Sequence, residues 1–195
     1  MLLDFDIEVS DKNSSFRFVT QFLEALEDRP LEVVAGIQGV DGEQRYKAVT
    51  ENNRRVAVED DTAPTLFEIA MMNEYGAPFR MYPIPARPAF RNAFDLKSQR
   101  YLNFVKDATN KILKAASGSA RQQMVDALAK LGLKMEGDIK RSIRDLGDPP
   151  NSEMTIQFKG SANPLIDSGR YRQSVTSEVR DIESGKGLKS LSGGK

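Results

Sequence analysis

Apolar and polar residues alternate in several short segments, and a period of two predicts strands with one buried face. Near the N-terminus, four apolar residues alternate with acidic ones: Leu3, Phe5, Ile7 and Val9. The apolar segment 31–37 predicts a second strand. Shorter alternations around 46–49 and 56–58 predict that residues 43–61 form a hairpin that projects from the body of the protein.

Helical spacing first appears between residues 16 and 26, where apolar residues recur every three or four positions. Ser14 or Ser15 is suited to cap the N-terminus of this helix, and Pro30 ends the region. The first part of the chain therefore predicts the order strand, helix, strand.

A shorter helix is predicted from local end signals. Thr65 and Glu68 have the spacing of a capping box, so the helix is expected to run to about Tyr75. Gly76 follows, where a residue with positive φ commonly ends a helix, and Gly169 occupies a similar position in a later turn. Both glycines are interpreted as backbone requirements and not as binding residues.

Two long amphipathic helices are predicted in the middle of the chain. Pro88 suits the first turn of the first helix, whose apolar stripe continues to about Ala116, and Gly118 breaks it. The second helix carries an apolar stripe from Met124 to Leu146. Two such helices joined by a short break are expected to pack as a hairpin.

The remaining segments are shorter. Residues 77–88 contain four prolines, which predict an extended, stiff loop on the surface. Met154, Ile156 and Phe158 alternate with polar residues and predict an edge strand or an extended arm. A turn at 163–169, a helical turn at 170–174 and a last strand at 175–179 complete the prediction.

Together these elements predict an α+β fold, with a small, mostly antiparallel sheet packed on the pair of long helices and with extended loop and C-terminal arms. Residues 1–182 are expected to form a single domain. Residues 183–195 are rich in Gly, Ser and Lys and are expected to form a flexible tail, because they cannot bury enough apolar surface to offset the entropy of ordering.

Composition narrows the function classes. The chain of 195 residues balances 28 Lys and Arg with 28 Asp and Glu, which argues against a general nucleic-acid binder and against docking on an acidic membrane. It contains no His, Cys or Trp, which excludes Ser-His-Asp triads, Cys nucleophiles, Cys/His zinc sites and disulfides. With no signal-peptide pattern and no membrane-length apolar run, the expected class is a soluble intracellular protein without cofactors.

Two blocks of residues resemble a family of tailed-bacteriophage neck and tail-completion proteins, the minor-tail-protein-Z-like and virion-morphogenesis group. Members commonly show N-E-[FY]-G and I-P-A-R-P-F, two helices, and then P-P, T, K-G, P-L-I-D-[TS]-G and S-[IV]. The matching positions here are 73–76, 84–90, 149–150, 155, 159–160, 164–169 and 174–175. Departures are Ala89 before Phe90, Ser168 where Thr is commoner, and the long excursion at 43–61.

The resemblance implies a structural, non-enzymatic virion protein that is assembled in the host cytoplasm and stands at the head–tail junction, or collar. There it would help to complete the tail or neck so that it joins the DNA-filled head. By analogy with phage tails, copies of the chain are expected to form a ring, with a hexamer favoured and a dodecamer as the alternative. Adjacent neck, connector, tail-tube or terminator proteins are the other expected partners, with DNA only as passing cargo.

Two segments are predicted to make the intermolecular contacts. The Pro-rich loop is stiff, so it loses little entropy on docking. Its predicted contact residues are Arg80, Tyr82, Pro83, Pro85 and Arg87. In the tail, Leu188 and Leu191 are the only large apolar residues, and they are predicted to dock into a neighbour together with strand addition at a sheet edge.

Two other function classes stay open. An oxygen-metal hydrolase or nuclease would need several carboxylates to converge within about 2.6 Å of an ion. Its candidate ligands are Asp4, Asp6, Asp60 and Asp61, for which a solvated strand face and a polar turn are the favoured interpretation. An intracellular adaptor that binds a host protein through the Pro-rich loop is the other alternative.

Overall fold

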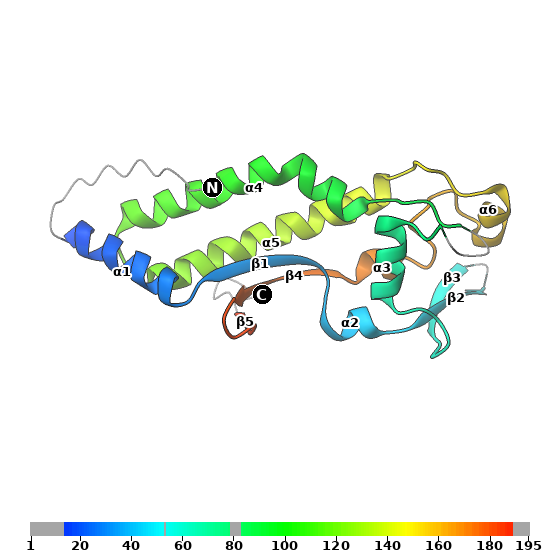
Figure 1. Cartoon of the computed structure of the whole chain (residues 1–195), viewed down its shortest axis with the longest axis horizontal. Helices are drawn as coiled ribbons and strands as arrows, with labels where there is room; N and C mark the ends of the chain where they lie inside the picture. Colours follow the sequence, from blue (N-terminus) through cyan, green and yellow to red (C-terminus); the bar gives the residue numbers. More distant parts are fainter. Residues whose placement is uncertain (1–13, 53, 79–82, 189–195) are drawn as a thin grey trace. The chain divides into compact units, whose positions relative to one another are not determined.

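The computed structural model describes residues 14–52, 54–78 and 83–188 of the 195. It confirms the predicted α+β class, with small antiparallel sheets packed against two long helices, α4 (Ala89–Ala115) and α5 (Ala120–Asp145) (Figure 1). Both helices begin and end close to the predicted positions, and the break between them contains Gly118 with φ of 72°. The strand predicted at residues 3–9 lies outside the described residues.

The chain divides into two compact units, the first built from three separated segments and the second from two. Unit 1 comprises residues 1–34, 97–134 and 177–195, and unit 2 comprises residues 35–96 and 135–176. Unit 2 has two segments in the sequence, so the chain passes repeatedly from one unit to the other. The single domain expected over residues 1–182 stays a prediction.

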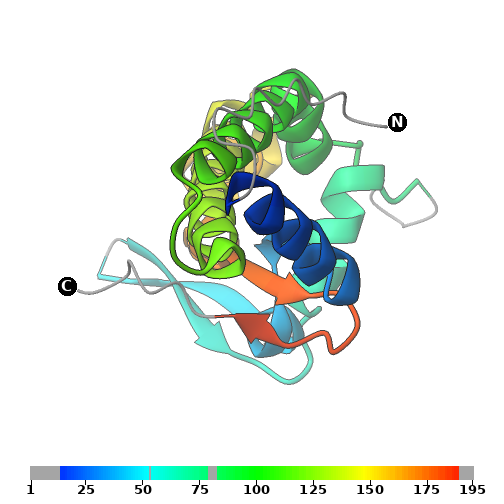
Figure 2. The same cartoon turned by 90° about the vertical axis from the view of Figure 1, so that its left-hand side faces the viewer.

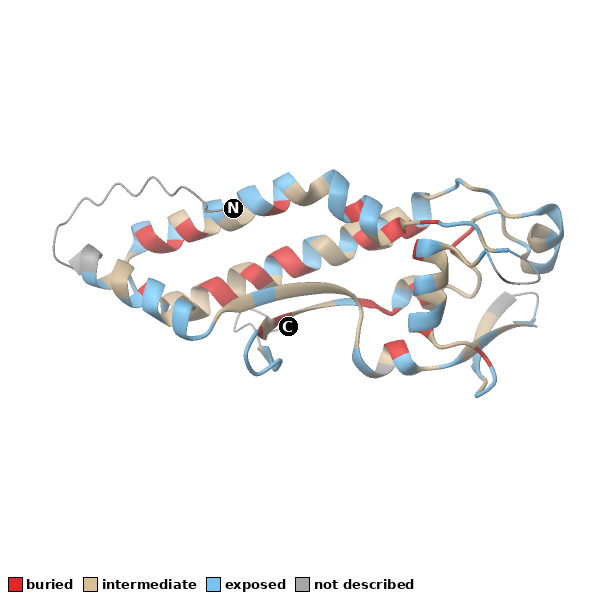
Figure 3. Cartoon of the chain, viewed as in Figure 1, coloured by how far each residue is buried: buried red, intermediate tan, exposed pale blue. Residues whose placement is uncertain are grey.

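Unit 1 brings the two long helices together with the end segments of the chain. Its other elements are α1 (Ser14–Asp28), the first part of β1 (Leu31–Ile37), the last part of β4 (Val175–Asp181), and β5 (Gly187–Leu188). Within this unit α4 and α5 run side by side in opposite directions, as predicted (Figure 1). Its buried apolar residues on the helices follow the predicted stripes: Phe22, Tyr101, Ile112, Leu113, Met124, Leu128 and Leu131. Val125 on α5 and Val179 on β4 are also buried, and Figure 3 shows the buried positions in red.

Helix α5 approaches the strands of unit 1 closely at Gly132. A Cβ at this position would lie 3.1 Å from the Val33 Cγ2 and 3.1 Å from the Ser177 Cβ. These distances are shorter than most carbon contacts between side chains, so a glycine lets the helix pack onto β1 and β4 at this point.

Arg121 joins three elements of unit 1. Its Nη1 donates to the carbonyl oxygen of Ala25 at 3.0 Å and to that of Arg29, both at the end of α1. Its Nη2 lies 3.1 Å from the carboxylate of Asp181 at the end of β4. A cation at the C-terminal end of a helix pairs with carbonyls that have no partner inside the helix, so Arg121 also caps α1.

The first part of the C-terminal tail differs from the prediction. β5 pairs antiparallel with β4, with Leu188 opposite Val179 (Figure 2). The turn between them is held by Asp181, whose carboxylate accepts hydrogen bonds from the backbone N–H and the hydroxyl of Ser184 at 3.1 and 3.2 Å. Leu188 thus finds its strand partner inside its own chain, because this turn returns the tail to β4. Leu191 lies outside the described residues.

Unit 2 contains the remaining elements: α2 (Gly39–Glu43), β2 (Tyr46–Glu51), β3 (Arg54–Glu59), α3 (Leu66–Tyr75), α6 (Glu153–Lys159) and α7 (Arg170–Gln173). The pairing of β2 with β3 confirms the predicted hairpin. The core consists of residues from α4, α5, the loop before α7, α7 and β4: Ala89, Ala93, Ile139, Ile143, Leu165, Tyr171 and Val175. These residues fix the start of α4 against the end of α5.

The edge strand or arm predicted at 154–158 is wrong, because this segment is helix α6. The Ser152 side chain accepts a hydrogen bond from the Thr155 N–H, which caps the N-terminus of the helix. Gly160, with φ of 66°, ends it, and its N–H donates to the carbonyl oxygen of Ile156. The two end signals determine the structure here, and the alternation of Met154, Ile156 and Phe158 does not mark a sheet face.

Candidate functional site

The two motif segments of the sequence meet in unit 2, at the start of α4, and Arg87 joins them. Its Nε donates to the Pro149 carbonyl oxygen at 2.9 Å, and its Nη2 donates to the Pro150 carbonyl oxygen at 3.0 Å. Its backbone N–H donates to the carbonyl oxygen of Asn73 at 2.5 Å. Burial lowers the pKa of the guanidinium, but an arginine remains charged at neutral pH. Arg87 is therefore a charged side chain whose hydrogen bonds hold together two segments about 60 positions apart in the sequence.

Glu74 caps the N-terminus of α4 from outside the helix. Its carboxylate accepts hydrogen bonds from the backbone N–H groups of Phe90 at 3.2 Å and of Arg91 at 2.9 Å. Arg91 also pairs with this carboxylate through its Nε at 3.1 Å, and its guanidinium lies 4.9 Å from the centre of the Tyr75 ring. A buried carboxylate is stabilised at a helix N-terminus, where N–H groups have no partner inside the helix.

Asn163 organises the turn of the second motif segment. Its Oδ1 accepts hydrogen bonds from the backbone N–H groups of Leu165 at 3.1 Å and Ile166 at 3.0 Å. Its Nδ2 donates to the carbonyl oxygen of Arg144 at 2.6 Å, near the end of α5. Lys159 donates to the Asn163 and Pro164 carbonyl oxygens at 3.1 and 3.2 Å. The polar side chains of this segment thus hold its own backbone in shape.

A cleft of about 220 Å³ lies beside this turn. It is lined by Tyr46, Ala48, Leu66, Ile69, Asn73, Lys159, Pro164, Leu165, Asp167, Ser168, Gly169, Arg170 and Tyr171. The Arg170 Nη2 donates to the Gln44 Oε1 at 2.6 Å, and the guanidinium lies 4.6 Å from the centre of the Tyr46 ring. Burial, followed by the charge of Glu74, raises the pKa of the Tyr171 hydroxyl, so Tyr171 stays protonated at neutral pH.

Two buried atoms of this cleft have no hydrogen-bond partner among the described residues: the Arg170 Nε and the Tyr171 hydroxyl oxygen. Buried polar atoms of this kind are commonly satisfied by an ordered water. Two of the residues that line the cleft thus keep one buried polar atom each without a partner among the described residues.

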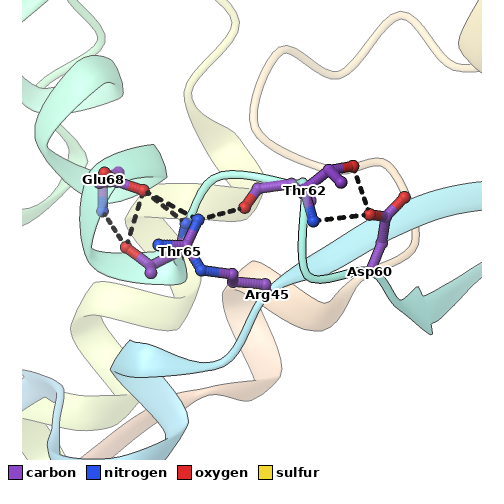
Figure 4. Close-up of polar contacts among 6 residues, drawn as sticks. Arg45, Asp60, Thr62, Thr65 and Glu68 are labelled. Carbon is purple, nitrogen blue, oxygen red and sulfur yellow. Dashed lines mark hydrogen bonds and ion pairs between the residues drawn. The ribbon is translucent and has the colours of Figure 1, made fainter.

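The candidate metal ligands Asp60 and Asp61 lie in the turn between β3 and α3. Figure 4 shows Asp60 in this turn. The Asp60 carboxylate accepts hydrogen bonds from the Thr62 hydroxyl at 2.5 Å and the Thr62 N–H at 2.9 Å, and these contacts lower its pKa. Within the described ranges, no group of three or more Asp or Glu residues is placed to hold a metal ion, whereas Asp4 and Asp6 lie outside those ranges. The Asp60 carboxylate therefore stabilises the turn between β3 and α3.

The predicted capping box of α3 is confirmed (Figure 4). The Glu68 N–H donates to the Thr65 hydroxyl at 3.1 Å, and the Thr65 N–H donates to the Glu68 carboxylate at 2.7 Å. Arg45 adds a hydrogen bond to the Ala63 carbonyl oxygen at 2.6 Å. The predicted capping box thus fixes the start of α3, and Arg45 adds a contact that the sequence analysis did not predict.

The predicted contact residues of the Pro-rich loop have different outcomes. Pro83 and Pro85 are exposed, as expected of a surface loop. Arg80 and Tyr82 lie outside the described residues. Arg87 was predicted as an exposed intermolecular contact, and this is wrong, because its side chain is occupied inside unit 2 and the residue is only 7% exposed.

Both predicted backbone glycines adopt positive φ, with 78° at Gly76 and 83° at Gly169. At Gly76 an added Cβ would also lie 3.0 Å from the Ile84 carbonyl oxygen and 3.1 Å from the Ala86 nitrogen. At Gly169 the nearest atom is a side-chain nitrogen of Gln173 at 3.5 Å. Conformation requires glycine at both positions, and close backbone packing requires it at Gly76 as well.

Sequence analysis missed the roles of Glu74 and Asn163, although both lie in the motif segments. Glu74 caps a helix that begins 15 positions later in the chain, and no local spacing marks such a pair. Asn163 precedes Pro164, and this Asn-Pro pair is a known start of a turn, which is the one signal that points to its role.

None of the helices within the described residues is both long enough and apolar enough to cross a membrane. Comparisons of the chain with protein-family models, with curated proteins and with solved structures find no match.

Proposed function

We propose that this chain is a non-enzymatic structural protein of the head–tail junction of a tailed bacteriophage. Copies of it, arranged as a ring, would help to complete the tail or neck and to join it to the DNA-filled head. The proposal starts from the order and spacing of the two motif segments, which resemble those of neck and tail-completion proteins.

The observation that carries the proposal is the use of the motif side chains inside unit 2. Arg87, Glu74 and Asn163 direct their polar atoms to backbone groups of distant segments. A catalytic group must be free to contact a substrate, whereas these side chains hold loops and helix ends in fixed positions. Such a rigid arrangement is suited to a subunit that is assembled once and must keep its shape.

The charge of the chain is also consistent with this function. Its 28 basic and 28 acidic residues give no net charge at pH 7. A strongly basic protein beside the path of DNA would bind phosphates and slow the passage of the genome. A balanced surface avoids this retention.

Deletion of the gene from the phage that encodes this chain tests the proposal. We expect DNA-filled heads and separate tails to accumulate, as counted by negative-stain electron microscopy, and a plasmid copy of the wild-type gene to restore joined particles. Joined, infectious particles in the absence of the chain would contradict the proposal.

A second plasmid separates this function from the metal-dependent alternative. A copy with Asp60→Asn and Asp61→Asn keeps the oxygen acceptor of the turn but removes both negative charges. We expect this copy to restore particle joining as well as the wild type does. Loss of rescue by a variant that is folded normally would favour the hydrolase interpretation instead.

A further inference from the structure

The cleft of unit 2 is lined by two residues that each keep a buried hydrogen-bond donor without an acceptor. They are Arg170, through its Nε, and Tyr171, through its hydroxyl. The Arg170 Nε–H can only donate. Tyr171 is 8% exposed, and burial raises the pKa of its hydroxyl, so this group also keeps its proton. Among the described residues, both donors thus lack an oxygen atom to bind.

The oxygen atoms that lie around Arg170 are already used by another part of its guanidinium. Asp41, Gln44 and Tyr46 each accept from Nη2, at 3.3, 2.6 and 3.0 Å. These contacts fix the guanidinium in place. The acceptor that the Nε needs is therefore expected to come from another molecule.

The carboxylate nearest in effect to Tyr171 is occupied in the same way. The charge of Glu74 helps to raise the pKa of the Tyr171 hydroxyl, but its two oxygens accept from the backbone N–H groups of Phe90 and Arg91. The Tyr171 ring packs edge to face on Phe90, with 6.2 Å between the ring centres. This packing fixes the ring, so the hydroxyl is held in a defined position.

Much of the rest of the cleft is apolar. Its volume of about 220 Å³ equals the share of about seven molecules in liquid water. Water against apolar walls finds few partners, so an apolar group that displaces it gains affinity. The apolar lining residues come from β2, from α3 and from the turn before α7: Ala48, Leu66, Ile69, Pro164 and Leu165.

The charges in and beside the cleft give no excess of positive charge. Lys159 and Arg170 line it together with Asp167. Asp41 pairs with Arg170 from beside the cleft, and the charge of Glu74 acts on Tyr171. An anionic ligand would therefore meet negative charges as well as positive ones. An uncharged acceptor, such as the carbonyl oxygen of an amide, fits the two donors better.

We infer that this cleft binds a peptide segment of a partner protein, with one apolar side chain against the apolar wall and a main-chain carbonyl oxygen on the donors of Arg170 and Tyr171. Every residue of a peptide chain carries a carbonyl group beside its side chain, so a single apolar residue supplies both groups. The inference goes beyond the proposed function and does not rest on it.

NMR titration of the ¹⁵N-labelled full chain with N-acetyl-leucine N-methylamide tests the inference. This probe is one apolar residue between two uncharged carbonyl groups. We expect it to shift the Arg170 Nε–H resonance and the backbone N–H resonances of Gly169 and Arg170, with a dissociation constant on the order of 1 mM. N-acetylglycine N-methylamide lacks the apolar side chain and is expected to bind at least about threefold more weakly. Equal affinity of the two probes would contradict the apolar contact.

Tyr171→Phe removes one of the donors and keeps the ring. We expect it to weaken binding of the leucine probe by about threefold to tenfold, the effect of one hydrogen bond. Tyr75→Phe is the matched control, because Tyr75 is an exposed tyrosine of the same unit that does not line the cleft, and its affinity is expected to equal that of the wild type. Unchanged affinity in Tyr171→Phe overturns the inference.

Two further measurements exclude the other occupants of the cleft. Tyr171→Phe without a probe is expected to melt at the wild-type temperature or above it, because the hydroxyl that it removes is buried without a partner. A lower melting temperature would show that an ordered water already binds the hydroxyl, and would overturn the inference. Sodium acetate at the same concentrations is expected to leave the Arg170 Nε–H resonance unchanged. If acetate shifts it and the leucine probe does not, the cleft binds an anion and the inference is overturned.

Discussion

In each unit an arginine joins segments that lie far apart in the sequence, and these two arginines, Arg121 and Arg87, differ in their acceptors. Arg121 in unit 1 pairs with the carboxylate of Asp181 and with carbonyls at the end of α1. Arg87 in unit 2 donates to the carbonyl oxygens of Pro149 and Pro150, which carry no charge.

The two arginines thus show two ways of joining distant segments. One is an ion pair with a carboxylate, and the other is a set of hydrogen bonds to uncharged carbonyl oxygens. An ion pair that is partly exposed depends on pH and salt, because its acceptor titrates and its field is screened. The hydrogen bonds of a buried guanidinium to carbonyl oxygens depend less on pH and on salt. Removal of that guanidinium, however, leaves buried acceptors without partners. Arg87 joins the motif segments of unit 2 through uncharged acceptors, although the unit also contains ion pairs such as that of Arg91 with Glu74.

Arg87→Ala is expected to have the largest effect. It removes a charged donor and leaves the Pro149 and Pro150 carbonyls unsatisfied, so we expect the free energy of unfolding to fall by about 3–4 kcal/mol. Urea denaturation followed by circular dichroism measures the change. Arg100→Ala, at an exposed position of α4, is the control, and its free energy of unfolding is expected to stay within about 0.5 kcal/mol of the wild type. An equally small change in the free energy of unfolding for Arg87→Ala would show that Arg87 does not hold the two segments together.

Arg121→Ala is expected to lower the free energy of unfolding by less, about 1–3 kcal/mol. Helix α1 ends at the surface, so water can satisfy part of the lost contacts. The same denaturation experiment, with Arg100→Ala again as the control, measures it. A loss greater than that of Arg87→Ala would reverse the comparison between the two units.

A pair of glycine substitutions compares backbone packing in the two units. Gly76 in unit 2 and Gly118 in unit 1 both have positive φ. At Gly76 an added Cβ would meet backbone atoms, whereas at Gly118 it would meet only the flexible end of Gln123, at 3.3 Å. We expect Gly76→Ala to lower the free energy of unfolding by about 2 kcal/mol and Gly118→Ala to lower it by about 1 kcal/mol. Equal decreases of the melting temperature for the two variants would show that the close packing of Ile84 and Ala86 against Gly76 does not affect stability.

The smallest effect is expected from the titration of Asp181. The Ser184 N–H and hydroxyl, followed by the charge of Arg121, hold the pKa of this carboxyl below its ordinary value. A depressed pKa in the folded state contributes stability above the unfolded pKa, near about pH 4, and this stability is lost as pH falls through the folded pKa. We therefore expect Asp181→Asn to be less stable than the wild type at pH 7, with a difference that shrinks below about pH 4.

Unit 2 provides the control for this pH profile. Because the carbonyl acceptors of Arg87 do not titrate, the stability difference between Arg87→Ala and the wild type is expected to stay constant between about pH 3 and 8. Urea midpoints measured at each pH give both profiles. A difference for Asp181→Asn that does not change with pH would show that its carboxylate contributes through packing alone.

The elements that the sequence predicts correctly are those with local signals. The capping box of Thr65 and Glu68 marks the start of α3, and Gly118 marks the break between the two long helices. The hairpin at 43–61 is likewise visible in a short alternation. In each case the residues that determine the element lie within a few positions of one another, where spacing carries the information.

The errors arise where distant or competing interactions decide. Arg87 resembles an exposed residue of a Pro-rich loop, and its acceptors lie 62 and 63 positions away, so nothing near it indicates burial. In α6 the alternating Met154, Ile156 and Phe158 suggest a strand, while the caps at either end form a helix of seven residues. The return of the tail to β4 depends on one turn around Asp181.

The position of the chain in intact, purified phage particles, determined by cryo-electron microscopy, tests the central claim most directly. We expect density for this fold at the head–tail junction, repeated around the tail axis. Infectious particles that contain no copy of the chain at that junction would contradict it.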